Sequence, residues 1–287
     1  MKKILYFGPK GSYTQKAMNK AIKLLNLTGF EPEPRPYISD IIFELDKNPD
    51  YIGVLPIENS IEGIVRETVD NIIRTENQLK IFQEILIPIS HCLCNTTGDI
   101  SKVKTIISHP QALAQCNGYI RNLRKELNFD IQTRSATSTS QAVKSLSDLD
   151  ETFGAITSPE TAELYGAKIL AKAINDEKDN KTRFICIGRN YPHKTGCDMT
   201  SFAFTTLNKP GALVDVLSVL KEYDLNMSHI DSRPSKKVFG EYMFYVDVDG
   251  HIEDENVKSA LDKIKPLTTF YYMLGSYPKD KEDGNND

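Results

Sequence analysis

The order of strand-like and helix-like segments constrains the fold of this chain more than any other feature. From Lys3 to about Gly188, short apolar runs typical of buried strands alternate with segments whose apolar residues recur at helical spacing. Lys3–Phe7 and Phe153–Thr157 are runs of the first kind, and Ser12–Leu25 is a segment of the second. The alternation predicts an α/β unit with parallel sheets and helices on both faces.

The order changes after the polar segment Arg189–Met199, which is typical of a linker because it contains proline and glycine. Beyond it, the predicted order is β-α-β-β-α-β, which is that of a ferredoxin-like domain. We therefore predict one domain at residues 1–190 and a second at residues 199–277. Residues 278–287 are charged and contain glycine, so we expect a disordered tail there.

Composition excludes several classes of function. With 287 residues and a net charge of −4, the chain is not expected to bind nucleic acid or an anionic membrane surface. No apolar run approaches the ~18 residues of a membrane span. The short run Ile4–Phe7 ends at Gly8-Pro9, which favours a first strand over a signal peptide. The 5 cysteines are an odd number without CxxC spacing, which favours a cytoplasmic location.

The string His91-Cys92-Leu93-Cys94 has the residue types of a metal site. On a strand, however, Cys92 and Cys94 would share one face while His91 points to the other. No second ligand pair follows at a usual spacing. We therefore expect no metal.

The apolar run Tyr51–Ile57 ends abruptly in Glu58-Asn59-Ser60. A buried strand that ends in an acid, an amide and a hydroxyl can form a small-molecule site, because ligands of open α/β sheets bind at the carboxyl ends of strands. A helix start capped by Ser60 explains the same residues equally well.

Other strings also place polar groups at the ends of predicted elements. Gly8–Ala17 is a tight turn into a helix start that suits an anion. Ser108–Cys116 follows a short predicted strand. Thr182-Arg183-Phe184 opens a strand with a hydrogen-bond donor, a cation that could clamp a carboxylate, and an aromatic wall. In the second domain, Pro210–Leu217 begins a helix and Asp231–Pro234 ends a strand, so both could border one groove.

Taken together and in this order, these strings closely resemble the prephenate dehydratase family with a C-terminal ACT domain, from Lys3 to about Gly275. The resemblance implies a two-lobed catalytic unit like the type II periplasmic binding proteins, followed by a ferredoxin-like ACT domain. It implies a lyase that converts prephenate to phenylpyruvate, carbon dioxide and water without metal or organic cofactor. It also implies inhibition by phenylalanine bound at the ACT domain, and a homodimer or homotetramer.

The resemblance assigns roles to residues motif by motif. Residues implied in catalysis are Glu58, Asn59, Thr182, Arg183 and Phe184. Residues implied in substrate binding are Ser60, Ser108, Gln115, Ser138 and Thr139. Residues implied in phenylalanine binding are Gly211, Ala212, Leu213, Val214, Asp231, Ser232, Arg233 and Pro234. Arg183 would clamp a substrate carboxylate, and Thr182 would hydrogen-bond the leaving hydroxyl, with Glu58 as the alternative proton donor. The family usually has Glu where this chain has Asp231.

Two alternatives remain open at the level of sequence. Arogenate dehydratase performs the same chemistry on a substrate with an amino group in place of the keto oxygen. A non-catalytic amino-acid sensor is compatible with a two-lobed fold.

Overall fold

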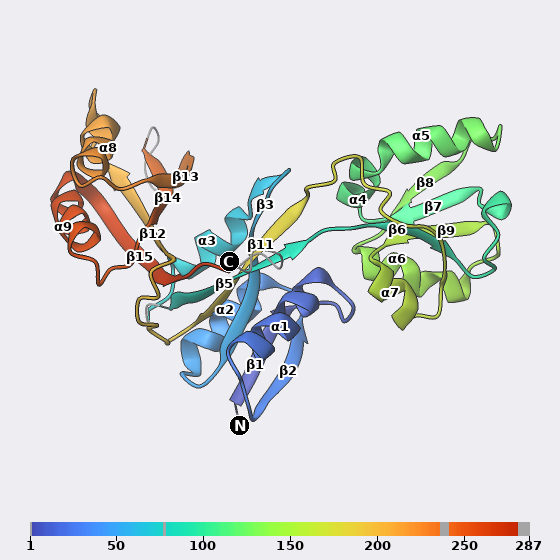
Figure 1. Cartoon of the computed structure of the whole chain (residues 1–287), viewed down its shortest axis with the longest axis horizontal. Helices are drawn as coiled ribbons and strands as arrows, with labels where there is room; N and C mark the ends of the chain where they lie inside the picture. Colours follow the sequence, from blue (N-terminus) through green and yellow to red (C-terminus); the bar gives the residue numbers. More distant parts are fainter. Residues whose placement is uncertain (1, 77–78, 236–240, 281–287) are drawn as a thin grey trace.

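The first lobe lies between the two other units of the protein, as Figure 1 shows. The structure is a computed structural model that describes residues 2–76, 79–235 and 241–280. The first lobe comprises residues 2–88 and 181–188, the second lobe residues 92–171, and the C-terminal domain residues 198–280.

The sheet of the first lobe is mixed, with strand order β5-β11-β3-β1-β2 and β4 paired to β3. The strands are β1 (Lys2–Phe7), β2 (Phe30–Arg35), β3 (Ile52–Asn59), β4 (Gly63–Ile64), β5 (Lys80–Pro88) and β11 (Lys181–Gly188). β11 runs antiparallel to β3 and β5 because the chain leaves this lobe through β5 and returns through β11. The predicted parallel pairing is therefore found here between β1 and its neighbours β2 and β3, and is wrong for β11.

Helices cover both faces of this sheet, as predicted. α1 (Tyr13–Leu24) buries Ala17 and Met18 on one face. α2 (Ile38–Lys47) and α3 (Arg66–Ile72) pack on the other face, around Leu55. The core around Leu55 continues into the C-terminal domain, where it includes Tyr277.

The second lobe has its own sheet, ordered β10-β6-β9-β7-β8. The strands are β6 (Cys92–Asn95), β7 (Thr105–Ser108), β8 (Gln132–Ser135), β9 (Phe153–Thr157) and β10 (Lys168–Ala171). The helices are α4 (Pro110–Gln115), α5 (Asn117–Glu126), α6 (Thr139–Ser145) and α7 (Pro159–Leu164), with short 3₁₀ turns at Ile100–Lys102 and Leu146–Asp148. The two-lobed arrangement that the resemblance implies is confirmed.

The C-terminal domain confirms the predicted β-α-β-β-α-β order. Its elements are β12 (Asp198–Thr206), α8 (Ala212–Glu222), β13 (Met227–Pro234), β14 (Tyr242–Asp249), α9 (Glu255–Ile264), a 3₁₀ turn (Lys265–Leu267) and β15 (Thr268–Pro278). The sheet order is β13-β14-β12-β15. α8 and α9 pack on one face of this sheet, around Phe202 and Val246.

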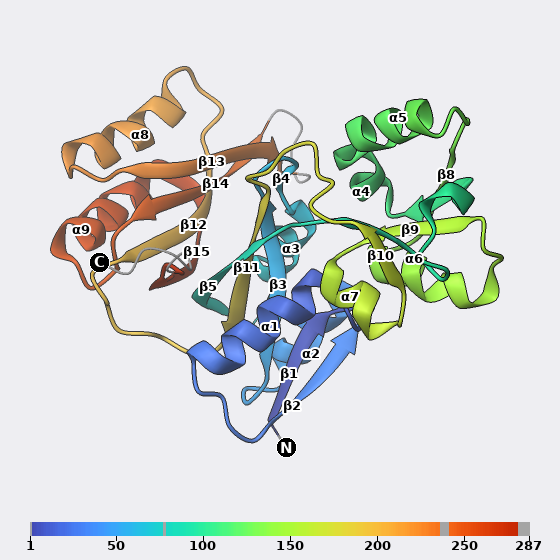
Figure 2. The same cartoon turned by 45° about the vertical axis from the view of Figure 1, so that its right-hand side comes forward.

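β15 joins the sheet of the C-terminal domain to that of the first lobe. Gly275 of β15 pairs in parallel with Ile81 of β5, and Figure 2 shows the two strands side by side. A Cβ at position 275 would lie 2.2 Å from the Ile81 carbonyl oxygen, so only glycine allows this approach.

The region predicted as a disordered tail begins with residues that contact the folded units. Asp280 accepts a hydrogen bond from the Leu86 backbone at 2.7 Å and lies 2.8 Å from Lys20 Nζ. The remainder of that prediction falls on residues 281–287, outside the described residues. Within the described ranges, none of the helices combines the length and apolarity that a membrane crossing requires.

Candidate active site

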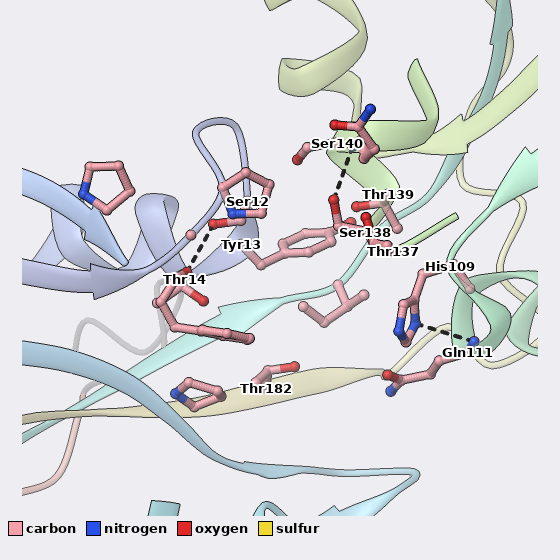
Figure 3. Close-up of a pocket in the computed structure, with 18 of the residues that line it drawn as sticks. Ser12, Tyr13, Thr14, His109, Gln111, Thr137, Ser138, Thr139, Ser140 and Thr182 are labelled. Carbon is pink, nitrogen blue, oxygen red and sulfur yellow. Dashed lines mark hydrogen bonds between the residues drawn. The ribbon is translucent and has the colours of Figure 1, made fainter. Parts of the chain in front are cut away.

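A cleft of about 770 Å³ lies between the first and second lobes. Its lining comes from the β1–α1 turn, the end of β2, strands β3 and β11, and the starts of α4 and α6. The lining side chains with polar atoms are Ser12, Tyr13, Thr14, Arg35, Tyr37, Asn59, His91, His109, Gln111, Gln115, Thr137, Ser138, Thr139, Ser140, Gln141 and Thr182. In Figure 3, Thr182 lies across the space from Ser138 and Thr139, so hydroxyl groups of both lobes face a common volume.

Thr182 and Asn59 form the central pair of the first-lobe wall. They are register partners on β11 and β3, and both line the cleft. Asn59 Nδ2 donates to Thr182 Oγ1 at 2.9 Å. Because the hydroxyl oxygen accepts this bond, the hydroxyl proton can be donated into the cleft. The same bond stabilises negative charge that develops on Oγ1 as the proton moves.

Asn59 is held in one orientation, with only 7% of its surface exposed. Its Nδ2 also donates to Asn180 Oδ1 at 2.8 Å and to the Lys181 carbonyl at 3.1 Å. Its Oδ1 accepts from the backbone N–H groups of Ile61 and Glu62, each at 3.1 Å. These contacts prevent the amide from turning over, so the nitrogen stays directed at the threonine.

A bulge in β3 determines which side chains reach the cleft. The pairing with β11 shifts between Arg183 and Phe184, where Ile57 has no partner. Side chains on a regular strand alternate between its faces. The extra residue brings Pro56 and Asn59 to the same face although they are three positions apart, and both line the cleft.

The second lobe adds neutral donors and acceptors. Ser138 caps α6 by accepting from the Gln141 backbone N–H at 2.9 Å, and Thr139 follows it at the rim of the cleft. Gln115 accepts from Asn180 Nδ2 at 3.0 Å, which connects α4 to the segment that leads into β11. The predicted binding residues Gln115, Ser138 and Thr139 therefore lie around the same space as Thr182.

His91 and Tyr13 form a neutral pair in the cleft. Burial of His91 lowers its pKa to about 4, against the opposing effect of a hydrogen bond with Gln115. Burial also raises the pKa of Tyr13, whose hydroxyl donates to the Ser90 carbonyl at 2.6 Å and lies 3.3 Å from His91 Nδ1. Both side chains are therefore uncharged near pH 7.

Arg35 is the one Lys, Arg, Asp or Glu side chain among the described residues that line the cleft. Its guanidinium is paired with Glu44 through Nε at 2.5 Å and Nη2 at 3.0 Å, and with Glu33 through Nη1 at 2.7 Å. Hydrogen bonds from Arg35 and Lys3 lower the pKa of Glu33 to about 2. The cleft is thus a site of neutral hydrogen-bond donors with one cation that is already neutralised.

Arg183 and Glu58 do not lie where their predicted roles would place them. Neither lines the cleft. Because side chains alternate along a strand, the residues next to Thr182 and Asn59 point to the opposite face of the sheet. There, Arg183 Nη2 lies 2.9 Å from Glu58 Oε2 and 2.6 Å from Asp247 Oδ2 in the C-terminal domain.

Two predicted binding residues also lie outside the cleft. Ser108 is fully buried and donates to the Ile156 carbonyl at 2.7 Å, which fixes β7 against β9. Ser60 is exposed, and its hydroxyl accepts from the Lys181 N–H at 3.0 Å. Phe184 is where expected, since it lines the cleft with 2% of its surface exposed.

The residues predicted to bind the effector divide between two places. Gly211, Ala212, Leu213 and Val214 line a pocket of about 240 Å³. Along β13, Ser232 and Pro234 are exposed on one face. Asp231 and Arg233 point the other way, toward Arg66 at 3.6 Å and toward Asp70 of the first lobe. Within one chain, Asp231 and Arg233 therefore do not reach the pocket.

Several cleft residues were not singled out from the sequence as site residues, among them Tyr13, Arg35, His91 and Gln111. Tyr13 lies inside the glycine-containing turn string, which was a usable signal. His91 comes from an apolar run that gives no sign of ending at a cleft.

The fold and site define a two-lobed α/β protein with an interlobe ligand cleft, extended by a ferredoxin-like domain with its own pocket. Residues 4–192 match the family model described as prephenate dehydratase, and residues 202–266 match the ACT domain. The chain belongs to the prephenate dehydratase family.

Its relatives match it over nearly its full length. It is 39% identical to the prephenate dehydratase of Methanocaldococcus jannaschii, over 96% of this chain and 98% of that protein. It is 40% identical to the bifunctional chorismate mutase/prephenate dehydratase of Aquifex aeolicus, over 96% of this chain and 74% of that protein. The crystal structure of the Arthrobacter aurescens prephenate dehydratase in complex with L-Phe superposes with a TM-score of 0.83 at 31% identity, covering 96% of this chain and 90% of that one.

Proposed function

We propose that this protein converts prephenate to phenylpyruvate, carbon dioxide and water, as its family membership supports. The observation that carries the mechanism is the hydrogen bond from Asn59 Nδ2 to Thr182 Oγ1 at 2.9 Å. Thr182 donates its proton to the departing ring hydroxyl, which leaves as water while the ring carboxylate leaves as carbon dioxide, and Thr182 then takes a proton from solvent to regain its hydroxyl. The ring becomes aromatic, which supplies the driving force. A positioned proton donor typically contributes ~10²–10⁴-fold in rate.

Neutral donors suit the substrate carboxylates. A free cation would bind the departing carboxylate strongly in the ground state and oppose its loss. Thr14, Ser138 and Thr139 offer hydroxyl groups around the cleft, and Gln115 an amide. Phe184 forms an apolar wall against the ring. These roles replace the carboxylate clamp expected of Arg183.

The same lining supports prephenate over arogenate. Arogenate carries an ammonium group, a charge that is compensated best by a carboxylate when it is removed from water. Among the cleft-lining residues that the structure describes there is no Asp or Glu. Prephenate carries a keto oxygen at that position, which neutral donors can bind.

The proposal extends to phenylalanine as an inhibitor that binds the C-terminal domain. The Arthrobacter relative was crystallised with L-Phe. Gly211–Val214 line a pocket of about 240 Å³, a size that suits an amino acid. Val214 and Tyr242 at this pocket are 63% and 49% exposed, so a second chain could cover them in a homodimer or homotetramer. We also propose a cytoplasmic location, on the odd number of cysteines.

The test measures phenylpyruvate formed from prephenate by the wild type, Thr182→Ala and Thr182→Ser, with and without phenylalanine. We expect Thr182→Ala to lower kcat by ~10²–10⁴-fold and Thr182→Ser to retain most of the activity, since serine keeps the hydroxyl. Thr182→Ala at the wild-type rate would contradict the assigned role. Faster turnover of arogenate than of prephenate would contradict the proposed substrate.

A further inference from the structure

A buried ion cluster joins the first lobe to the C-terminal domain behind the cleft. At its centre, Arg183 is 7% exposed and contacts Glu58 at 2.9 Å and Asp247 at 2.6 Å. Glu84 of β5 approaches the same guanidinium at 3.7 Å. Asp247 is fully buried, so loss of its partner Arg183 would leave a buried negative charge without compensation, at a high energetic cost.

The C-terminal domain fixes both of the closer carboxylates. Asp247 lies on β14, and its second oxygen accepts from Ser201 Oγ of β12 at 2.5 Å. His229 of β13 places Nδ1 3.2 Å from Glu58 Oε1. The aromatic ring of Tyr245 packs edge-on against His229 and closes the cluster from the same domain.

This cluster and the Thr182–Asn59 pair are built on adjacent residues of the same two strands. Thr182 is the register partner of Asn59, and Arg183 is the register partner of Glu58. The first pair faces the cleft and the second faces the C-terminal domain. Since one peptide bond separates the members of the two pairs, a shift of the backbone at Arg183 or Glu58 also shifts the hydroxyl and the amide on the other face.

We propose that Arg183 is a positioning residue which, together with Asp247 and His229 of the C-terminal domain, holds Thr182 and Asn59 in their reactive geometry. This inference rests on the proposed function of Thr182. It assigns the C-terminal domain a direct part in forming the active site. A movement of the C-terminal domain would then shift Arg183 and, through the backbone, the proton donor Thr182.

The test compares Asp247→Asn and His229→Asn with Arg66→Gln as a matched control. Arg66 forms an ion pair across the same junction, with Asp231 at 3.6 Å, but it is 62% exposed and neither residue adjoins a cleft residue on β11. We expect each cluster variant to lower kcat by about 10–100-fold with KM changed by less than about threefold. The control should keep the wild-type kcat. Thermal unfolding and circular dichroism confirm that each variant is folded, and His229→Asn serves if Asp247→Asn does not fold.

A double-mutant cycle separates positioning from general damage. If the cluster acts through Thr182, the cluster substitutions should cause no further loss of kcat when Thr182→Ala is already present. An equal loss in both backgrounds, or wild-type kcat in folded His229→Asn, would overturn the inference. If the wild type formed no phenylpyruvate, the proposed function and the inference would fail together. If the wild type is active, the results above test the inference alone.

Discussion

Replacing Asn59 with aspartate tests the direction of the hydrogen bond on which the mechanism depends. Asn59→Asp preserves the shape of the side chain but replaces the donating nitrogen with an oxygen. That oxygen would face three acceptors at 2.8, 3.1 and 2.9 Å, on Asn180, Lys181 and Thr182. Of these, the Thr182 hydroxyl can readily reverse its role and donate. Its proton would then bind the new carboxylate instead of the substrate.

The magnitude follows from what each partner loses. The Lys181 carbonyl cannot reverse, and Asn180 can do so only by giving up its bond to Gln115 Oε1 at 3.0 Å. Each buried group left unsatisfied costs on the order of 1–3 kcal/mol of stability. Withdrawal of the proton donor should lower kcat by ~10²–10⁴-fold, the same loss that we expect for Thr182→Ala.

The pH dependence of the variant is the decisive assay. Because position 59 is 7% exposed, burial should raise the pKa of the introduced carboxyl. Below that pKa the protonated carboxyl can donate to Thr182 Oγ1 again, so residual kcat should rise as the pH falls. Asn59→Ala, which cannot titrate, is the control and should show no such rise. If Asn59→Asp turned over at the wild-type rate at pH 8, the reasoning about hydrogen-bond direction would be refuted.

Three further predictions concern the junction and the titrating histidines. Gly275→Ala should lower the thermal unfolding midpoint, because its Cβ would lie 2.2 Å from the Ile81 carbonyl oxygen and overpacking costs about 1–3 kcal/mol; an unchanged midpoint would contradict this. Burial lowers the pKa of His91 from 6.5 to about 4, so below pH 6.5 the unfolded state binds more protons and stability should fall toward pH 4. Urea titrations should show that acid lowers the free energy of unfolding less in His91→Gln than in the wild type. Equal decreases in the two proteins would count against this prediction. The hydrogen bond that His229 donates to Glu58 raises the pKa of His229 above 6.5 and lowers the pKa of Glu58 below 4.5, so their pairing stabilises most between those values. His229→Asn should therefore destabilise more at pH 6 than at pH 9, and the reverse order would rule this out.

Local pattern was sufficient for most elements of the fold and insufficient where tertiary context overrides it. Pro32 and Pro34 argue against a strand at Phe30–Arg35, yet β2 forms there. The two prolines are two positions apart, so the N–H groups that they lack would lie on the same side of the strand. β2 is also the last strand of its sheet. The continuous apolar run Leu79–Leu93 favours a single strand, but it contains β5 and the start of β6, which belong to different sheets. No residue type marks the crossing between lobes.

The sequence predicted which residues form the candidate site better than it predicted the directions in which their side chains point. Thr182, Asn59, Gln115, Ser138 and Thr139 all line the cleft, as their motifs imply. Period-two alternation alone could have separated the neighbours of Thr182 and Asn59 from the cleft. Which face of the sheet is the cleft face, and where the bulge lies, depend on strand pairing and could not be predicted from the chain.

The arginines next to the cleft share one arrangement. Arg35 is held by Glu33 and Glu44, and Arg183 by Glu58 and Asp247, each within 3.0 Å. A reaction that expels a carboxylate benefits from this neutralisation, since cations near the departing group would stabilise the ground state more than the transition state.

Glu44→Gln tests that principle at the arginine that lines the cleft. The substitution keeps the shape of the partner but removes its charge, so Nε and Nη2 of Arg35 become available to a substrate carboxylate while Nη1 stays paired with Glu33 at 2.7 Å. We expect KM to fall and kcat to fall with it, because tighter ground-state binding raises the barrier to decarboxylation. Steady-state kinetics at several salt concentrations should show both effects diminish as salt screens the cation. An unchanged kcat with a lower KM would show that Arg35 binds substrate and transition state equally, and the neutral lining of the cleft would then need another explanation.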